Sequence, residues 1–223
     1  MNDYSGIPPV VAIDGPSASG KGAVSVLVSR SLGFNYLESG LLYRVVGAIV
    51  LKNKLKWEDK LIHGFISDQK ISWDNNGYPL VNGCLFSGLY DPEVSLAASR
   101  VAKIGLIRDI LLKLQQDCRQ NPGLVAEGRD MGTVVFPDAR LKIFLTAIPE
   151  VRAKRRFLQL KERGGCVKMS EVLEEILLRD SYDSTRKVSS LRVAEDAIVI
   201  DSTNMSVNRV VDEVLRYVSQ RIL

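Results

Sequence analysis

The chain has 223 residues, of which 46% are hydrophobic and 25% are charged, and its formal net charge is +4. That size fits one large domain, or one domain that carries an insertion, and the composition is that of an ordinary globular protein. We expect neither a membrane span nor a secretory signal, because no long apolar run is present and the N-terminal residues lack a basic region followed by an apolar one. Three dispersed cysteines indicate a reducing cytoplasm, and a single histidine, His63, excludes a histidine-rich metal site.

Short apolar segments alternate with amphipathic segments along the chain. The expected strands cover residues 10–13, 34–37, 124–126, 141–147 and 197–200. The expected helices, in which apolar residues recur at helical spacing, cover residues 21–32, 40–52, 101–118 and 207–222. This alternation is typical of an α/β fold in which helices cover both faces of a parallel sheet.

Residues 71–83 break this alternation, because they have the features of a β-hairpin that turns at Asn75, Asn76 and Gly77. Antiparallel strands within a parallel series indicate an insertion, which we expect at residues 40–103. The core domain then comprises residues 1–39 and 104–223.

Residues 15–21, G-P-S-A-S-G-K, connect the first expected strand to the first expected helix. This is the spacing of the phosphate-binding loop G-x-x-x-x-G-K, in which backbone N–H groups converge on a phosphate and the lysine reaches the β- and γ-phosphates. Gly22 departs from the version in which a serine or threonine hydroxyl holds Mg²⁺. We therefore expect Mg²⁺ to be held through the nucleotide phosphates and water, without metal ligands from the protein.

Arginines follow the expected strands at the edge where parallel sheets bind their ligands. Arg44 follows the second strand, and Arg129 comes directly after the third. Two further groups have the spacing of a single helical face: Arg152, Arg155 and Arg156, and then Arg179, Asp183 and Arg186. Guanidinium groups bind phosphate oxygens bidentately, and phosphoryl transfer depends on positioning and on charge neutralisation. The pattern therefore predicts a kinase that brings two phosphorylated ligands together.

Taken together, the motifs resemble the bacterial-type cytidylate kinase family of nucleoside monophosphate kinases. The matching stretches are I-D-G-P-S-A-S-G-K-G from residue 13, E-S-G-L-L-Y-R from residue 38, E-G-R-D-M-G-T-V-V-F-P-D-A from residue 127, K-I-F-L-T-A from residue 142, R-D-S-Y-D from residue 179 with Arg186, and D-S-T from residue 201. The resemblance implies a P-loop kinase fold with a five-stranded parallel sheet, a nucleotide-binding insertion that contains a small antiparallel sheet, and a short lid at about residues 152–168. It also implies that a cytoplasmic monomer transfers the γ-phosphate of ATP to CMP or dCMP, giving CDP or dCDP.

The resemblance further implies a role for each candidate site residue. The ATP-binding set is Gly15, Pro16, Ser17, Ala18, Ser19, Gly20, Lys21, Gly22 and Ala23, with Thr203 near the adenine. The CMP-binding set is Ser39, Arg44, Ser99, Arg108, Arg129, Asp130, Arg179, Asp183 and Arg186. Within it, Asp130 would accept from the N4 amino group of cytosine, and Arg44 and Arg129 would hold the phosphate. The catalytic set is Lys21 and Arg129, with the lid residues Arg152, Arg155 and Arg156.

Three residues depart from the family pattern. Ala23 stands in place of a threonine, Glu38 in place of an aspartate and Leu41 in place of an alanine. The missing threonine hydroxyl predicts a modest loss of ATP affinity, since the backbone N–H groups and Lys21 remain. Glu38 and Leu41 flank Ser39 and leave the breadth of acceptors open.

Two alternative functions stay open at this point. The first is another small-molecule P-loop kinase that acts on UMP, shikimate or dephospho-coenzyme A. The second is a protein that binds ATP as a regulator without chemistry, or a weak RNA-binding protein. Aromatic residues make up only 7% of the chain, which argues against nucleic acid. We therefore expect ATP, CMP and dCMP as partners, with neither nucleic acid nor membrane.

Overall fold

We describe a computed structural model of the chain that covers residues 6–74, 78–162, 164–165, 167–185 and 190–222. The chain divides into two compact units, one formed by residues 1–36 with 119–223 and the other by residues 37–118. The expected turn at residues 75–77 and the candidate Arg186 lie outside the described residues.

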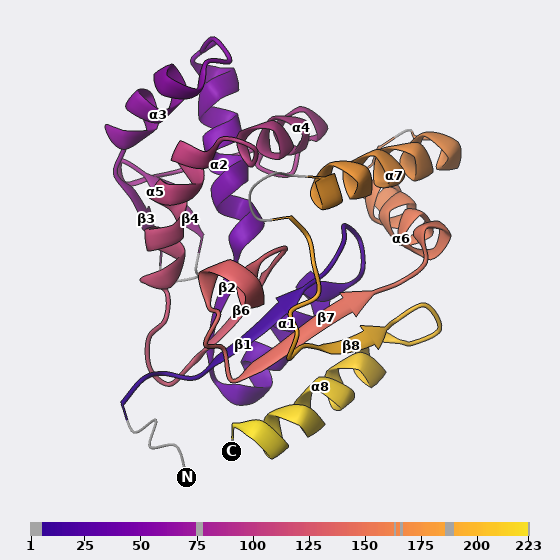
Figure 1. Cartoon of the computed structure of the whole chain (residues 1–223). Helices are drawn as coiled ribbons and strands as arrows, with labels where there is room; N and C mark the ends of the chain where they lie inside the picture. The colour runs from indigo at the N-terminus through magenta and orange to yellow at the C-terminus, as the bar shows by residue number, and fades with distance from the viewer. Residues whose placement is uncertain (1–5, 75–77, 163, 166, 186–189, 223) are drawn as a thin grey trace. The chain divides into compact units, whose positions relative to one another are not determined.

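A five-stranded parallel sheet forms the centre of the first unit, with the strand order β2-β6-β1-β7-β8 (Figure 1). Its strands are β1 (Val10–Asp14), β2 (Asn35–Glu38), β6 (Leu124–Gly128), β7 (Leu141–Thr146) and β8 (Ile198–Asp201). Every residue of β1 and of β6 is buried. Because both faces of these central strands are covered, their sequences are continuous apolar runs up to a polar residue at the carboxyl end. The expected α/β fold with a parallel sheet is confirmed.

Helices α1 (Lys21–Leu32) and α8 (Val207–Arg221) cover one face of this sheet. Val24 of α1 and Val214 of α8 belong to one buried cluster with strand residues such as Ile13. Two further helices, α6 (Pro149–Glu162) and α7 (Met169–Thr185), pack against each other through Ala153, Val172 and Ile176. A single π-helical turn, η1 (Met131–Val135), follows β6 and packs against β1 and β6.

The second unit has its own hydrophobic core, built mainly from four helices. These are α2 (Ser39–Lys52), α3 (Asp59–Ser67), α4 (Pro92–Val101) and α5 (Gly105–Gln116). Helices α2 and α4 approach closely at Gly47, where a Cβ would lie 2.8 Å from the backbone nitrogen of Ala98. A small antiparallel sheet with the order β3-β4-β5 completes the unit: β3 (Ile71–Trp73), β4 (Pro79–Val81) and β5 (Cys84–Leu85). None of the helices described in either unit combines the length and the apolar character that a membrane crossing requires.

The second compact unit continues to residue 118, because Ile107 and Leu111 of α5 belong to its core. The insertion expected at residues 40–103 stays a prediction. The single helix expected at residues 101–118 is wrong, because Val101 ends α4 and Ile104 is extended, with φ −84° and ψ 107°. Val101, Ile104 and Ile107 are all buried in one cluster, so their spacing looked like that of a continuous helix.

Candidate active site

The loop between β1 and α1 depends on residues that accept unusual backbone conformations. A Cβ on Gly15 would overlap the carbonyl oxygen of Leu145 in β7, so only glycine fits there. Ala18 and Gly20 have φ values of 59° and 96°, and Gly20 forms the N-terminal cap of α1. The first turn of α1 holds no acidic residue. Its unpaired N–H groups and partial positive charge are therefore available to an anion.

The hydroxyl of Ser19 is a buried polar group inside this loop. Its Oγ has no hydrogen-bond partner among the described residues. A buried hydroxyl without a partner costs free energy, and a phosphate oxygen in the loop would satisfy it. The observation fits the predicted use of the loop.

Lys21 begins α1, and its side chain is buried over the loop. Nζ donates to the carbonyl oxygen of Pro16 at 3.0 Å. Burial lowers the pKa of Lys21 to about 7, and the positive charge of Arg129 acts in the same direction, while Glu127 and Asp14 oppose both. A negatively charged phosphate would restore the ammonium form, because an opposite charge nearby favours ionisation.

Asp14, at the end of β1, fixes the backbone that follows β6. Its Oδ1 accepts from the N–H of Met131 at 2.9 Å, and its Oδ2 accepts from the N–H of Gly132 at 2.8 Å. Burial raises the pKa of Asp14 to about 6, although these two hydrogen bonds lower it. Because Arg129 and Asp130 immediately precede the two amides, Asp14 fixes their place. No motif signals this contact, because the two residues lie 117 positions apart in the chain.

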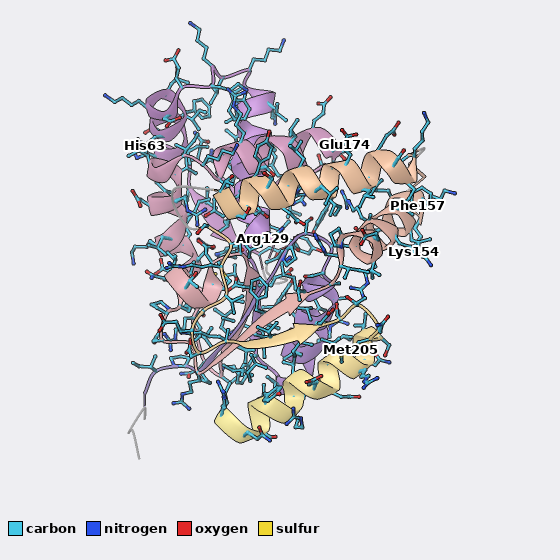
Figure 2. The ribbon with its side chains drawn as sticks, turned by 45° about the vertical axis from the view of Figure 1, so that its right-hand side comes forward. His63, Arg129, Lys154, Phe157, Glu174 and Met205 are labelled. Atoms are coloured by element: carbon cyan, nitrogen blue, oxygen red, sulfur yellow. The ribbon has the colours of Figure 1, made fainter. Side chains whose placement is uncertain are left out.

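Arg129 lies where β6 ends, beside the C-terminal part of α7 (Figure 2). Its Nε donates to Oδ2 of Asp183 at 2.7 Å, and its Nη1 donates to the carbonyl oxygen of Gly128 at 3.3 Å. Burial lowers the pKa of Arg129. Nearby acidic groups raise it again, and Glu127 has the largest effect among them. Asp130 is also buried. The structure thus brings together Arg129 and Asp183, two residues that the sequence predicted for one site.

Two arginines of α6, Arg152 and Arg155, contact the loop of residues 15–21, which we call the glycine loop. The third, Arg156, forms a hydrogen bond along its own helix. Arg152 donates to the carbonyl oxygen of Ser17 at 3.2 Å, and it pairs with both carboxylate oxygens of Asp180 in α7. Arg155 donates to the carbonyl oxygen of Ser19 at 3.1 Å. Arg156 donates to Gln159 at 2.9 Å on the exposed side of α6. Arg179 on α7 lies 4.0 Å from Glu175, and its charge lowers the pKa of Lys21.

The segment after β8 is tied to the same loop. The Oγ of Ser202 lies within hydrogen-bond distance of the carbonyl oxygens of Ser19 and Thr146, at 3.1 and 2.9 Å, and it accepts from Arg155 at 3.0 Å. The next residue, the candidate Thr203, donates to Asp201 through its hydroxyl. Ser202 was not predicted, although it belongs to the D-S-T motif that the sequence singled out.

In the second unit, three neighbours hold Arg44 in place on α2. Its Nη1 donates to the carbonyl oxygen of Leu89 at 3.0 Å and to Oγ of Ser95 at 2.6 Å. Its guanidinium group lies over the ring of Tyr90, 5.2 Å from the centroid. Tyr90 in turn donates to Glu38 at 3.0 Å, and burial together with this carboxylate raises the pKa of Tyr90. Ser95 and Tyr90 are missed by the sequence reasoning because neither belongs to a motif.

The other candidates of this unit lie on three of its helices. Arg108 on α5 is buried, with Nη1 donating to the carbonyl oxygen of Ala102 at 3.3 Å. Ser39 begins α2 and is buried. Ser99 on α4 donates to the backbone carbonyl of Ser95 at 3.1 Å. These residues give the unit a buried cation and two hydroxyls.

The acidic side chains described near the glycine loop are engaged by protein donors. In the described part of the chain, no group of three or more His, Cys, Asp or Glu residues is arranged to hold one. The oxygens of Asp14 accept from two backbone amides, and Glu127 accepts from Tyr36 at 2.7 Å. This donor set fits an ion that arrives with a nucleotide better than one that the protein binds by itself.

A G-x-x-x-x-G-K loop that joins a buried strand to a helix is typical of the class of P-loop nucleotide-binding proteins. Two solved structures share the fold. A shikimate kinase from Bacteroides thetaiotaomicron has a TM-score of 0.51 and 9% identity, with 95% of this chain and 98% of that chain covered. An uncharacterized protein from Eubacterium ventriosum has a TM-score of 0.52 and 13% identity, with 96% and 99% covered.

The sequence comparison identifies the family within this class. The family model for cytidylate kinase matches residues 11–220. A cytidylate kinase from Thermosipho melanesiensis is 42% identical, with 95% of this chain and 97% of the relative covered. A cytidylate kinase from Stutzerimonas stutzeri is 45% identical, with 96% and 97% covered. The chain belongs to the cytidylate kinase family, as its motifs predicted, and it is a phosphotransferase.

Proposed function

We propose that this chain transfers the γ-phosphoryl group of ATP to CMP and dCMP, giving CDP and dCDP. The observation that carries the proposal is the glycine loop with Lys21 and Arg129, in a chain that belongs to the cytidylate kinase family over almost its whole length. The two cations lie close enough to interact, because the positive charge of Arg129 lowers the pKa of Lys21. Paired cations of this kind suit a reaction in which two anionic ligands must approach each other.

In this proposal the triphosphate of ATP binds backbone N–H groups of residues 15–20, except Pro16, which has none, and the ammonium group of Lys21. Arg152, Arg155 and Arg156 act on the transferring group, and Thr203 completes the ATP side. The acceptor phosphate binds Arg129 and Arg44. No general base is needed, since the attacking phosphate oxygen is already an anion.

Recognition of the base and the sugar follows the same assignment. Asp130, which is buried, accepts from the amino group of cytosine, a donor that uracil lacks. Ser39, Ser99 and Arg108 supply the remaining polar contacts to the base. Arg179 and Asp183 contact the sugar and the nearby phosphate. Mg²⁺ enters with ATP, held by phosphate oxygens and water, and we propose a cytoplasmic monomer that draws on the nucleotide pool.

A panel of acceptors tests the proposal directly. ADP release is measured with CMP, dCMP, UMP and shikimate at equal concentrations, each with and without Mg²⁺. We expect CMP and dCMP to be the best acceptors, and Lys21→Ala to abolish the signal for all of them, which excludes a contaminating kinase. Equal or faster turnover of UMP or shikimate would overturn the choice of acceptor.

ATP binding should take up close to one proton at pH 8. Ligand-free Lys21 has a pKa of about 7 and is mostly neutral at that pH, and the nearby phosphates would raise its pKa again. Isothermal titration calorimetry in two buffers of different ionisation enthalpy measures the uptake. It should shrink at pH 6, where Lys21 is already charged, and vanish in Lys21→Met; equal uptake at both pH values would contradict the assignment.

Ser95→Ala should raise KM for CMP about tenfold and leave KM for ATP within twofold. The Ser95 hydroxyl accepts from Arg44 at 2.6 Å, and a hydrogen bond to a charged group contributes about 1.5–3 kcal/mol. Steady-state kinetics with each substrate varied in turn measures both constants. Ser67→Ala is the matched control, because its hydroxyl donates to His63 on the exposed surface of α3. Equal KM values for CMP in both variants would show that Leu89 and Tyr90 suffice to hold Arg44.

A further inference from the structure

Tyr36 and Glu127 form a hydrogen-bonded pair across the neighbouring strands β2 and β6. The phenol hydroxyl donates to Oε1 of Glu127 at 2.7 Å, and Glu127 as a whole residue is only 6% exposed. A hydrogen bond to an ionised, buried acceptor is among the stronger kinds in proteins. Neither residue was among the predicted site residues, although Glu127 opens the E-G-R-D motif.

The carboxylate of Glu127 lies against the start of α1. A Cβ built on Gly22 would be 3.2 Å from Oε1 and 3.7 Å from Oε2. Both oxygens therefore face the residue that follows Lys21. Of the acidic groups that raise the pKa of Lys21, Glu127 has the largest effect, and the same holds for Arg129. One buried carboxylate thus influences both cations to which we assign phosphate binding.

We propose that Tyr36 is a positioning residue, whose hydroxyl holds the Glu127 carboxylate beside Gly22 and keeps it from turning onto Lys21 and Arg129. This inference rests on the proposed function, because its consequence is that both cations stay available to phosphate. When no nucleotide is bound, the Glu127 carboxylate partly neutralises the positive charges of Lys21 and Arg129. One oxygen of this carboxylate is held away from them by the hydrogen bond from the Tyr36 hydroxyl.

The charged groups around Lys21 and Arg129 determine in which direction each substitution should move the pKa of Lys21. The charged and titratable groups that surround the two cations are Asp14 of β1, Tyr36 of β2, Glu127 of β6, Asp130 after Arg129, and Arg179, Asp180 and Asp183 of α7. Removing the phenol lets the carboxylate approach the cations, which raises the pKa of Lys21 and makes Glu127 a competitor of phosphate. Removing the negative charge of Glu127 lowers the pKa of Lys21. The two substitutions therefore act in opposite directions.

The experiment compares Tyr36→Phe with Glu127→Gln in the full chain. The ¹³Cε signal of Lys21, assigned by its loss in Lys21→Arg, is titrated without ligand, and KM for ATP is measured separately. In Tyr36→Phe we expect the midpoint to rise from about 7 and KM for ATP to increase about five- to tenfold. In Glu127→Gln we expect the midpoint to fall. Tyr217→Phe on α8, whose ring lies over Arg216, is the matched control and should change neither quantity.

A purely structural role for Tyr36 would give a different pattern. If Tyr36→Phe keeps the native circular dichroism spectrum and neither the midpoint nor KM for ATP changes, the inference is wrong. It is also wrong if both substitutions move the midpoint in the same direction. The titration needs no substrate, so a chain that fails to phosphorylate CMP would overturn the proposed function while the opposite shifts still support the role of Tyr36.

Discussion

Replacing Lys21 by alanine should lower kcat for phosphoryl transfer to CMP by about 10³-fold while the fold is retained. Removing one preorganised donor from the charge that develops in a transition state typically costs 10²- to 10³-fold, and here the donor also carries a full charge once phosphate binds. In the ligand-free protein the ammonium group contacts only a backbone carbonyl among its described hydrogen bonds, that of Pro16. Its burial is unfavourable to the charged form. Truncation therefore removes little that stabilises the fold, which far-UV circular dichroism and thermal unfolding would verify.

Lys113→Ala is the matched control for this prediction. Lys113 lies on α5 in a largely exposed ion pair with Asp117, and exposed pairs of this kind contribute about 0–1 kcal/mol. We expect wild-type kcat from this variant. A Lys21→Ala enzyme that keeps more than a tenth of the wild-type kcat would contradict the assignment, because phosphoryl transfer would then not depend on Lys21.

The elements around the glycine loop were predictable because local sequence determines them. The helix expected at residues 21–32 has those bounds in the structure, since a glycine precedes it as a cap and another follows it at Gly33 in the left-handed conformation. The strand expected at residues 10–13 extends by one residue to Asp14. Asp14 is polar, so a search for apolar runs stopped before it, although its carboxylate satisfies two backbone amides.

Side-chain contacts between distant segments were not predictable from a single sequence. Ser95 looks like any serine on a helix until the fold places it against Arg44, and Tyr36 looks like a strand residue until β2 aligns it with Glu127. The break between α4 and α5 could not be seen in the sequence either. Ile104 is buried in the same core as its helical neighbours, so the apolar residues keep the spacing of one helix across the break. The residues of the glycine loop and the arginines could be named from motifs, whereas their supporting partners required coordinates.

Arg129→Ala should lower kcat/KM for CMP by about 10³-fold and also destabilise the protein by about 3–5 kcal/mol. The activity loss follows from removing a bidentate phosphate ligand. The stability loss follows because Asp183, whose side chain is 9% exposed, would keep a buried charge without the 2.7 Å ion pair to Arg129. Steady-state kinetics and urea unfolding measure the two effects separately. Arg119→Ala, which breaks an ion pair with the more exposed Asp138, is the matched control and should leave kcat/KM unchanged.

The double variant Arg129→Ala/Asp183→Ala separates the role of Arg129 in catalysis from its role in the fold. Removing both partners also takes away the buried carboxylate of Asp183, so most of the lost stability should return. Phosphate binding by Arg129 is still absent, so kcat/KM for CMP should stay low. Arg129→Lys should likewise recover stability but remain about 10²-fold impaired, because an ammonium group cannot bind two phosphate oxygens in the geometry of a guanidinium group. If activity returned together with stability in either variant, Arg129 would be a structural residue, and the acceptor phosphate would have to be bound by other groups.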